Sequence, residues 1–251
     1  MNTGIKMSLL ATWMAASGSV ALAAEPEGWK FEITPYLWAA GLEGDVTVNG
    51  QKTDFEKSAG DLMDALDIGG SLLCVVQYDR FIAWGQVDYF SLSTDEMDVD
   101  DRPAGGTLDS EMVLGELAAG YQLDGWMEGQ TFDILLGTRM LSMKNDLALV
   151  DGRSASKENN IADAIVVVRP SIPMFPSKID GLRFNPTLAI GAGDSDLVYE
   201  LFPQIQYQVN ENIAARIGYR RVGYKFKGDE DEDNELNATL AGLIVGVGVT
   251  F

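Results

Sequence analysis

Alternating apolar and polar residues are the feature of this chain that most constrains its fold. In residues 196–209, Leu197 and Leu201 belong to an apolar row, whereas Glu200 and Gln204 belong to the intervening polar row. Successive side chains of a β-strand point to opposite faces, so such a segment has one apolar and one polar face. These rows fit strands with one face toward lipid and the other toward a barrel lumen.

Ten segments of this kind follow one another, separated by turn residues. The predicted strands are 29–41, 68–79, 80–94, 107–123, 130–144, 161–174, 182–192, 196–209, 212–226 and 236–251. Short breaks alternate with longer, more polar ones, which is the loop pattern of a transmembrane barrel. The sequence therefore predicts an all-β fold, an antiparallel up-and-down transmembrane β-barrel of about ten strands. Eight or twelve strands would follow if the short segments near 182–209 merged or a hairpin in 42–67 joined the wall.

The longest break has structure of its own. Asp45–Val48 and Thr53–Glu56 flank Asn49-Gly50, a strong signal for a two-residue hairpin turn. The segment Ser58–Leu66 then reads as one or two helical turns with its apolar residues on one side. Such a turn would cap the barrel mouth or, as we expect, pack on the hairpin beside it.

The predicted strand 161–174 departs from the general pattern. Ile165–Val168 is apolar on both faces, and Pro170 and Pro173 lie inside the segment. Proline cannot donate a backbone hydrogen bond to a neighbouring strand. We therefore predict a β-bulge or the end of the strand at this place.

Aromatic residues gather at both ends of the predicted strands. Those near the short breaks are Trp29, Phe31, Tyr78, Phe81, Tyr121, Trp126, Phe132, Phe175, Phe184, Tyr207 and Phe251. Those near the long breaks are Trp38, Tyr89, Phe90, Tyr199, Tyr219 and Tyr224. Amphipathic rings are favoured at headgroup depth, so two aromatic belts are expected of a barrel that spans a membrane.

The beginning of the chain is typical of a secretory signal peptide. A short apolar stretch ends in Ala21-Leu22-Ala23, which has the small-x-small spacing of a cleavage site. We expect cleavage after Ala23 or Ala24, with Ala21 and Ala23 as the recognised small residues. The chain then divides into a signal peptide, residues 1–23, and one barrel domain, residues 24–251. Export and a barrel fold together predict the outer membrane of a Gram-negative cell.

The charge of the chain is strongly acidic, with a formal net charge of −20 at pH 7. Nucleic acid is excluded as a partner, because binding phosphates requires an excess of Lys and Arg. Acidic residues cluster near 95–101 and 229–235, where we expect solvated loops. The alternative is that these loops bind divalent cations near an anionic lipid surface, although the second cluster lacks the ligand spacing of an EF-hand.

The absence of histidine limits the chemistry that the chain can perform. Without histidine the chain cannot form a Ser-His-Asp triad, a histidine general base or a histidine metal ligand. Cys74 is the only cysteine, so an intramolecular disulfide is impossible. No phosphate-binding loop or dinucleotide-binding motif is present. We therefore predict a protein without enzymatic activity, metal site or cofactor.

Charged residues of both signs fall on the rows that should face the lumen. They are Glu32, Asp88, Glu116, Asp133, Arg139, Arg169, Arg183, Glu200, Arg216 and Arg220. Buried charges must be paired or hydrated, and a small barrel is just wide enough for side chains to fill. We expect a salt-bridged lumen that fixes the strand register. The alternative is a narrow polar path in which Arg216 and Arg220 form a constriction that favours small anions.

Three segments carry a family resemblance. Phe31–Gly44 reads FEITPYLWAAGLEG, Asp61–Leu66 reads DLMDAL, and Ile217–Arg220 reads IGYR. In these segments the chain resembles a group of poorly characterised outer-membrane β-barrels of Gram-negative bacteria. The resemblance extends over most of the chain after the signal peptide. It implies a barrel fold and an outer-membrane location, and it implies no substrate.

The last predicted strand contains an assembly signal. Gly246, Val249 and Phe251 match the Gly-x-x-apolar-x-aromatic ending of strands that the outer-membrane assembly machinery recognises. Ile244 stands where that ending usually has a polar residue. The predicted partners are therefore this machinery, outer-membrane lipid and lipopolysaccharide.

These observations lead to one preferred function and two alternatives. The preferred function is a small outer-membrane barrel with a structural role or a role in interactions through its loops, and with a lumen filled by charged side chains. The first alternative is a narrow channel for small polar or anionic solutes. The second is a soluble periplasmic barrel that binds a lipophilic ligand, which would need an apolar interior and a polar exterior.

Overall fold

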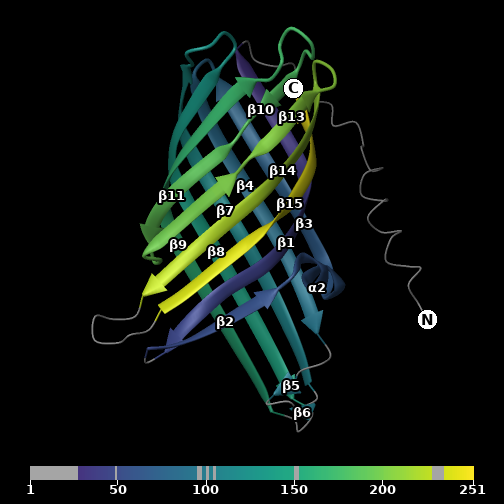
Figure 1. Ribbon diagram of the computed structural model, residues 1–251, viewed down its shortest axis with the longest axis vertical. Helices are drawn as coiled ribbons and strands as arrows, with labels where there is room; N and C mark the ends of the chain where they lie inside the picture. Colours follow the sequence, from purple (N-terminus) through teal and green to yellow (C-terminus); the bar gives the residue numbers. More distant parts are fainter. Residues whose placement is uncertain are drawn as a thin grey trace, which may run out of the picture.

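The chain forms a closed antiparallel β-barrel (Figure 1). The computed structural model describes residues 28–48, 50–94, 98–99, 102–103, 106–149, 153–227 and 235–251. The signal-peptide prediction, including Ala21 and Ala23, lies outside these residues, as does most of both acidic clusters.

Ten strand positions make up the wall, as predicted. In wall order they are β1 (Trp29–Val48), β3 (Leu66–Tyr78), β4 (Phe81–Thr94), β7 (Gly106–Asp124), β8 (Thr131–Leu149), β9 (Ser154–Pro173), β10 (Leu182–Phe184) with β11 (Thr187–Gly193), β12 (Leu197–Phe202) with β13 (Gln204–Gln208), β14 (Ile213–Lys227) and β15 (Glu235–Thr250). Pairing of β15 with β1, from Glu32↔Thr250 to Thr47↔Glu235, closes the barrel.

The two ends of the barrel differ in their connections. At the end where the C-terminus lies, the turns are tight, and Asp79 of the turn between β3 and β4 has a φ of 51° (Figure 1). At the opposite end, β7, β8 and β9 are long strands of 19, 19 and 20 residues, and the short strands β5 (Asp98–Val99) and β6 (Arg102–Pro103) lie beyond the wall (Figure 1). We refer to these ends as the short-turn end and the long-loop end.

The outside of the barrel is apolar. Its exposed side chains include Ile33, Leu37, Leu72, Val87, Leu117, Leu136, Val166, Ile190, Ile217 and Val245. A closed barrel satisfies its backbone hydrogen bonds internally, and an apolar outer band is the surface that a lipid bilayer requires. The chain is therefore a transmembrane β-barrel of the outer-membrane type.

The two predicted aromatic belts differ. Rings near the short turns, such as Trp126 and Tyr121, are exposed on the outside, as expected. The prediction is wrong for Trp38, Phe90 and Tyr224 at the other end, which are buried. These three residues fall on the inward rows of their strands, so their rings fill the lumen although they lie at belt height. The long-loop belt then consists of Tyr89, Tyr199 and Tyr219.

Three prolines meet at one level of the wall. The strand registers place Pro170 of β9, Pro186 between β10 and β11, and Pro203 between β12 and β13 opposite one another. Against β8, β9 continues through Pro170 without a shift in register, so the predicted bulge is absent there and the strand ends at Pro173. Proline lacks a donor, so the ladder is interrupted on three adjacent strands at the same place.

The predicted hairpin and helical turn of the longest break are both confirmed. Strand β2 (Gln51–Lys57) pairs with the far end of β1, and α2 (Ala59–Asp64) follows it. Ser58 caps α2, since its Oγ accepts from the backbone N–H of Asp61 at 3.2 Å and its own N–H donates to the Asp61 carboxylate at 3.0 Å. Hydrogen bonds from the Ser58 side chain and backbone lower the pKa of Asp61. Among the described residues, no helix is long and apolar enough to cross a membrane.

Candidate functional site

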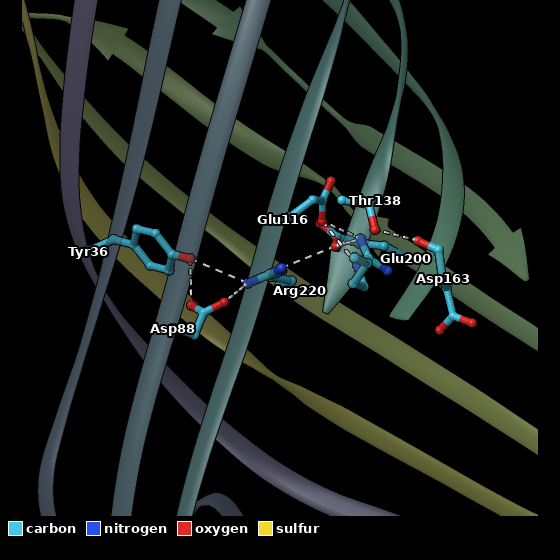
Figure 2. Close-up of polar contacts among 8 residues, drawn as sticks. Tyr36, Asp88, Glu116, Thr138, Asp163, Glu200 and Arg220 are labelled. Atoms are coloured by element: carbon cyan, nitrogen blue, oxygen red, sulfur yellow. Dashed lines mark hydrogen bonds and ion pairs between the residues drawn. The ribbon is translucent and has the colours of Figure 1, made fainter. Parts of the chain in front are cut away.

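Two arginines at mid-height of the lumen organise a buried network of charges (Figure 2). They are Arg139 of β8 and Arg220 of β14, and both are fully buried. Three predicted carboxylates surround them, those of Asp88, Glu116 and Glu200, which are buried as well. All five side chains belong to the inward rows of their strands, which is why the barrel brings them together.

Arg139 binds two carboxylates. Its Nε and Nη2 donate to the same oxygen of Glu116, Oε2, at 3.0 and 2.7 Å. Its Nη2 also donates to Glu200 Oε2. Glu116 lies on β7, the neighbour of β8, whereas Glu200 lies on β12, with β9 and β11 between them in the wall. The second contact therefore crosses the lumen.

Arg220 continues the network to the opposite wall. Its Nη2 donates to Glu200 Oε2 at 3.2 Å, and its Nη1 donates to Asp88 Oδ2 at 2.7 Å. Asp88 lies on β4, and β3, β1 and β15 separate it from β14 in the wall. The hydroxyl of Tyr36 donates to the other oxygen of Asp88. Figure 2 shows this continuous path from Tyr36 through Asp88 and Arg220 to Glu200.

Neutral side chains complete the environment of the two arginines. The amide of Gln86 is oriented by its neighbours, because only its oxygen can accept from Arg220 Nη2, at 2.7 Å. The guanidinium of Arg220 also lies 4.7 Å from the centroid of the Trp38 ring. A cation over the face of an indole is attracted by the ring quadrupole. Arg220 is thus enclosed by an aromatic ring, an amide and two carboxylates.

The network contains more negative than positive groups, with three carboxylates against two guanidiniums. Several of its buried atoms have no hydrogen-bond partner among the described residues, including Glu116 Oε1, Glu200 Oε1 and Arg139 Nη1. Removing ions from water is costly, and the cost is recovered only through good geometry and further hydrogen bonds. Burying the network therefore costs free energy, and the closed wall of the barrel holds its charged side chains in position.

The other predicted lumen charges lie nearer the short-turn end and do not belong to the central network. Arg216 pairs with Glu32, and Arg169 approaches Asp133 at 3.9 Å. Arg183 lies near the rim, where it donates to Ser171 Oγ and to the carbonyl of Gly129, both at 2.7 Å. Arg216 and Arg220 share a face of β14, but Arg220 belongs to the central network and Arg216 does not.

Sequence reasoning missed several members of the site. The sequence pattern places Tyr36 only within the family-like motif, and it places Trp38 in an outer belt. Gln86 and Asp163 both lie on inward rows and are buried, with Asp163 Oδ1 accepting from the backbone N–H of Ser195 at 2.9 Å. Gln86 could have been found because it stands two residues before Asp88, on the same face of β4.

The residues of the predicted assembly signal lie on the closing strand. Val249 pairs with Ile33 of β1 and with Ile213 of β14, and the backbone N–H of Phe251 donates to the carbonyl of Phe31 at 2.8 Å. Gly246 lies opposite Tyr36. Their role in assembly stays a prediction.

A metal site is not formed by the described part of the chain, which contains no group of three or more Cys, Asp or Glu residues arranged to hold an ion. The predicted cation-binding loops lie largely outside the described residues. The chemistry of the site is therefore that of paired charges, aromatic rings and amides.

Comparisons with known proteins find only distant structural similarity. No family model and no curated protein sequence matches the chain. Among solved structures, the outer-membrane protease OmpT from Escherichia coli aligns with 92% of this chain and 99% of its own, at 10% identity and a TM-score of 0.48. The attachment invasion locus protein Ail of Yersinia pestis aligns with 90% and 100%, at 13% identity and a TM-score of 0.38. The toluene transporter TodX of Pseudomonas putida aligns with 90% and 90%, at 8% identity and a TM-score of 0.35. These similarities are low, and the assignment of the barrel rests on the strand register itself.

Proposed function

We propose that this protein is a closed, non-conducting barrel of the outer membrane that acts through its long-loop end. The observation that carries the proposal is the chain of contacts across the lumen, in which Arg139 and Arg220 join β8 and β14 to a shared carboxylate on β12. The contacts of Arg139 with Glu200 and of Arg220 with Asp88 join strands that are not neighbours and hold the barrel in one cross-section. They also occupy the middle of any path through it.

A second layer supports the closed state. Directly on the long-loop side of the network, Leu114, Val198 and Val222 point inward and are almost completely buried. A small anion that travelled through the lumen would have to displace both the arginines and this apolar layer. The narrow-channel alternative is therefore not favoured, and the soluble lipid-binding alternative conflicts with an apolar exterior and a charged interior.

The long-loop end is where the protein meets partners in this proposal. The strands β7, β8 and β9 extend beyond the rest of the wall and present polar and charged side chains there, such as Lys144, Asp146 and Glu158. Lipopolysaccharide and outer-membrane lipid would surround this end, and the assembly machinery would act earlier through β15. A catalytic role is not part of the proposal, because the chain has no histidine and the central charges are enclosed.

Single-channel recording in a planar bilayer tests the closed state. The folded wild-type protein should give no discrete conductance steps, and heat-modifiable gel migration would show that the barrel has formed. Replacing the two central arginines together with two residues of the apolar layer, Arg139→Ser, Arg220→Ser, Leu114→Ala and Val222→Ala, should produce conductance in those molecules that still fold. The rim variant Arg183→Ser is the matched control and should stay silent. Discrete steps from the wild type would overturn the proposal.

A further inference from the structure

A groove with a volume of about 670 Å³ lies on the barrel wall at the long-loop end, where β12, β14, β15, β1 and β2 meet. Arg221 and Lys225 of β14 line one side of it, and Glu43, Asp54 and Glu56 of the hairpin of β1 and β2 line the other. Sites for small ligands have volumes of roughly 300–1,000 Å³. The groove is therefore large enough for a ligand of the size of a disaccharide.

The groove begins where the lipid-facing band ends. Tyr219 of the long-loop belt is followed on the outward row of β14 by Arg221, Gly223 and Lys225. Tyr199, a second ring of that belt, lines the groove and lies across Gly223, because a Cβ at this glycine would overlap the ring. The groove thus borders the interface between lipid and water, at the depth where lipid headgroups lie.

Most charges of the groove are paired within it. Nη1 of Arg221 lies 2.7 Å from Oε1 of Glu43, and both side chains stay partly exposed. The Asp45 carboxylate accepts from Nδ2 of Asn237 at 2.9 Å and lies 3.2 Å from Nζ of Lys52. A ligand with charge of one sign only would meet groups of its own sign here. Paired charges that remain accessible instead suit hydroxyl groups, which both donate and accept hydrogen bonds.

Two opposite charges at the two sides of the groove have no ion-pair partner among the described residues. They are Lys225 on β14 and Glu56 on β2, and both are exposed. With β15 and β1 between these strands, three strand spacings of about 4.8 Å separate them. A ligand that fills the groove would place an anionic group beside Lys225 and hydrogen-bond donors beside Glu56.

We propose that the groove binds the phosphorylated sugar headgroup of lipopolysaccharide, with a phosphate at Lys225 and sugar hydroxyls at Glu56 and at the pair of Arg221 and Glu43. A phosphate forms charge-assisted hydrogen bonds with a lysine. The acyl chains would follow the apolar exterior past Tyr219 and Leu243, which are 45% and 59% exposed. This site rests on the part of the proposed function in which the long-loop end faces outward, and it does not depend on the closed lumen.

Native mass spectrometry of the folded full-length barrel, released from detergent micelles, measures how tightly lipids are retained. The first probe is lipid A with both phosphates on its sugars, and the second is the same lipid without phosphates. The third is phosphatidylglycerol, an anionic lipid whose headgroup has no sugar. Lys225→Gln removes the proposed phosphate contact. Lys157→Gln is the matched control, because it removes an exposed lysine of β9 at the same end that lines no part of the groove.

The wild type should bind phosphorylated lipid A about tenfold more tightly than the form without phosphates, since a hydrogen bond to a charged group has this order of strength. Lys225→Gln should remove most of that difference, and Lys157→Gln should keep it. Glu56→Gln should weaken the binding of lipid A and leave that of phosphatidylglycerol unchanged. Equal binding of lipid A by the wild type and Lys225→Gln would overturn the proposal, as would equal binding of lipid A and phosphatidylglycerol by the wild type.

Failure of this site can be told apart from failure of the proposed function. A conducting wild type would refute the closed lumen and leave the groove unaffected. The outward orientation is tested on intact cells, where a membrane-impermeant maleimide should label Lys157→Cys in a Cys74→Ser background. Absence of labelling in a folded barrel would overturn the orientation and the proposed function with it, whereas normal labelling without selectivity for lipid A would overturn the lipopolysaccharide site alone.

Discussion

The long-loop half of the lumen and the rim of its short-turn half are built on different principles, although the same strands form both. On the long-loop side of the central network, inward positions carry large apolar residues, such as Leu114, Val222 and Phe90, packed as in the core of a soluble protein. Toward the short-turn end, polar residues dominate the inward rows near the rim. There Gln122 donates to Asp133 at 2.9 Å and accepts from Gln77 at 3.2 Å.

This contrast explains why the central charges pair with one another. An apolar layer excludes water, so charges beside it must satisfy one another, whereas charges near a hydrated rim can exchange partners with water. Arg220 is fully buried and bound to two carboxylates, while Arg183 at the rim relies on Ser171 and a carbonyl group. The packed apolar side chains continue past the network on the short-turn side, where Leu135 and Val167 are fully buried, and the hydrogen-bonded part of the lumen begins nearer the rim.

The largest effect is expected in the central network. Glu200→Leu removes the carboxylate that Arg139 and Arg220 share, and leaves two buried guanidiniums with one carboxylate partner each. Removing one member of a buried ion pair typically costs about 3–5 kcal/mol of unfolding free energy. Urea unfolding of the barrel in detergent micelles measures the loss, with the exposed Glu211→Leu as control. A loss no larger than that of the control would show that the network does not hold the walls together.

A smaller but substantial effect is expected in the packed half. Leu114 is 1% exposed, and Leu114→Ala leaves a cavity among residues that pack tightly. Such a truncation costs about 2–5 kcal/mol, depending on how far the surroundings collapse. Leu117→Ala, at an exposed outward position of the same strand, is the matched control. If both variants lost the same stability in urea unfolding, this half would not be packed like a core.

The smallest effect is expected near the short-turn rim. Gln122→Ala removes one hydrogen bond to Asp133 and one from Gln77, each worth about 0.5–1.5 kcal/mol in net terms. Water can take the place of the amide in this half, so we expect the loss to fall at the lower end of that range. A loss of unfolding free energy as large as that of Leu114→Ala would mean that water is excluded from the rim as completely as from the long-loop half. That result would contradict the difference between the two regions.

Much of the wall follows from the sequence. Period-two rows and turn residues located ten strands, the hairpin at Asn49-Gly50 and the helical turn after Ser58, because these are local patterns that the backbone must obey. Near the ends of the strands, the sequence predicts less well which row of side chains points into the lumen and which points toward lipid. Trp38 and Tyr224 lie at the height of a belt, but their rows face the lumen, so height alone does not predict their position.

The partners within the lumen depend on closure of the barrel. The inward rows contain Asp88 and Arg220, but 132 positions separate these residues in the chain. The registers of four pairings, from β14 through β15, β1 and β3 to β4, bring them together. No local pattern encodes such a contact. The same holds for Glu200, which Arg139 and Arg220 reach from different sides.

The sequence by itself determined the strands, their two faces and the ends at which the loops are short or long, because hydrophobic periodicity and turn chemistry act over a few residues. Only the tertiary structure decided which charges pair across the lumen and where the apolar layer begins. It alone also showed that β1 exchanges β3 for β2 as its partner beyond Tyr36. These features depend on the number of strands and their stagger in a closed ring, which are properties of the whole barrel.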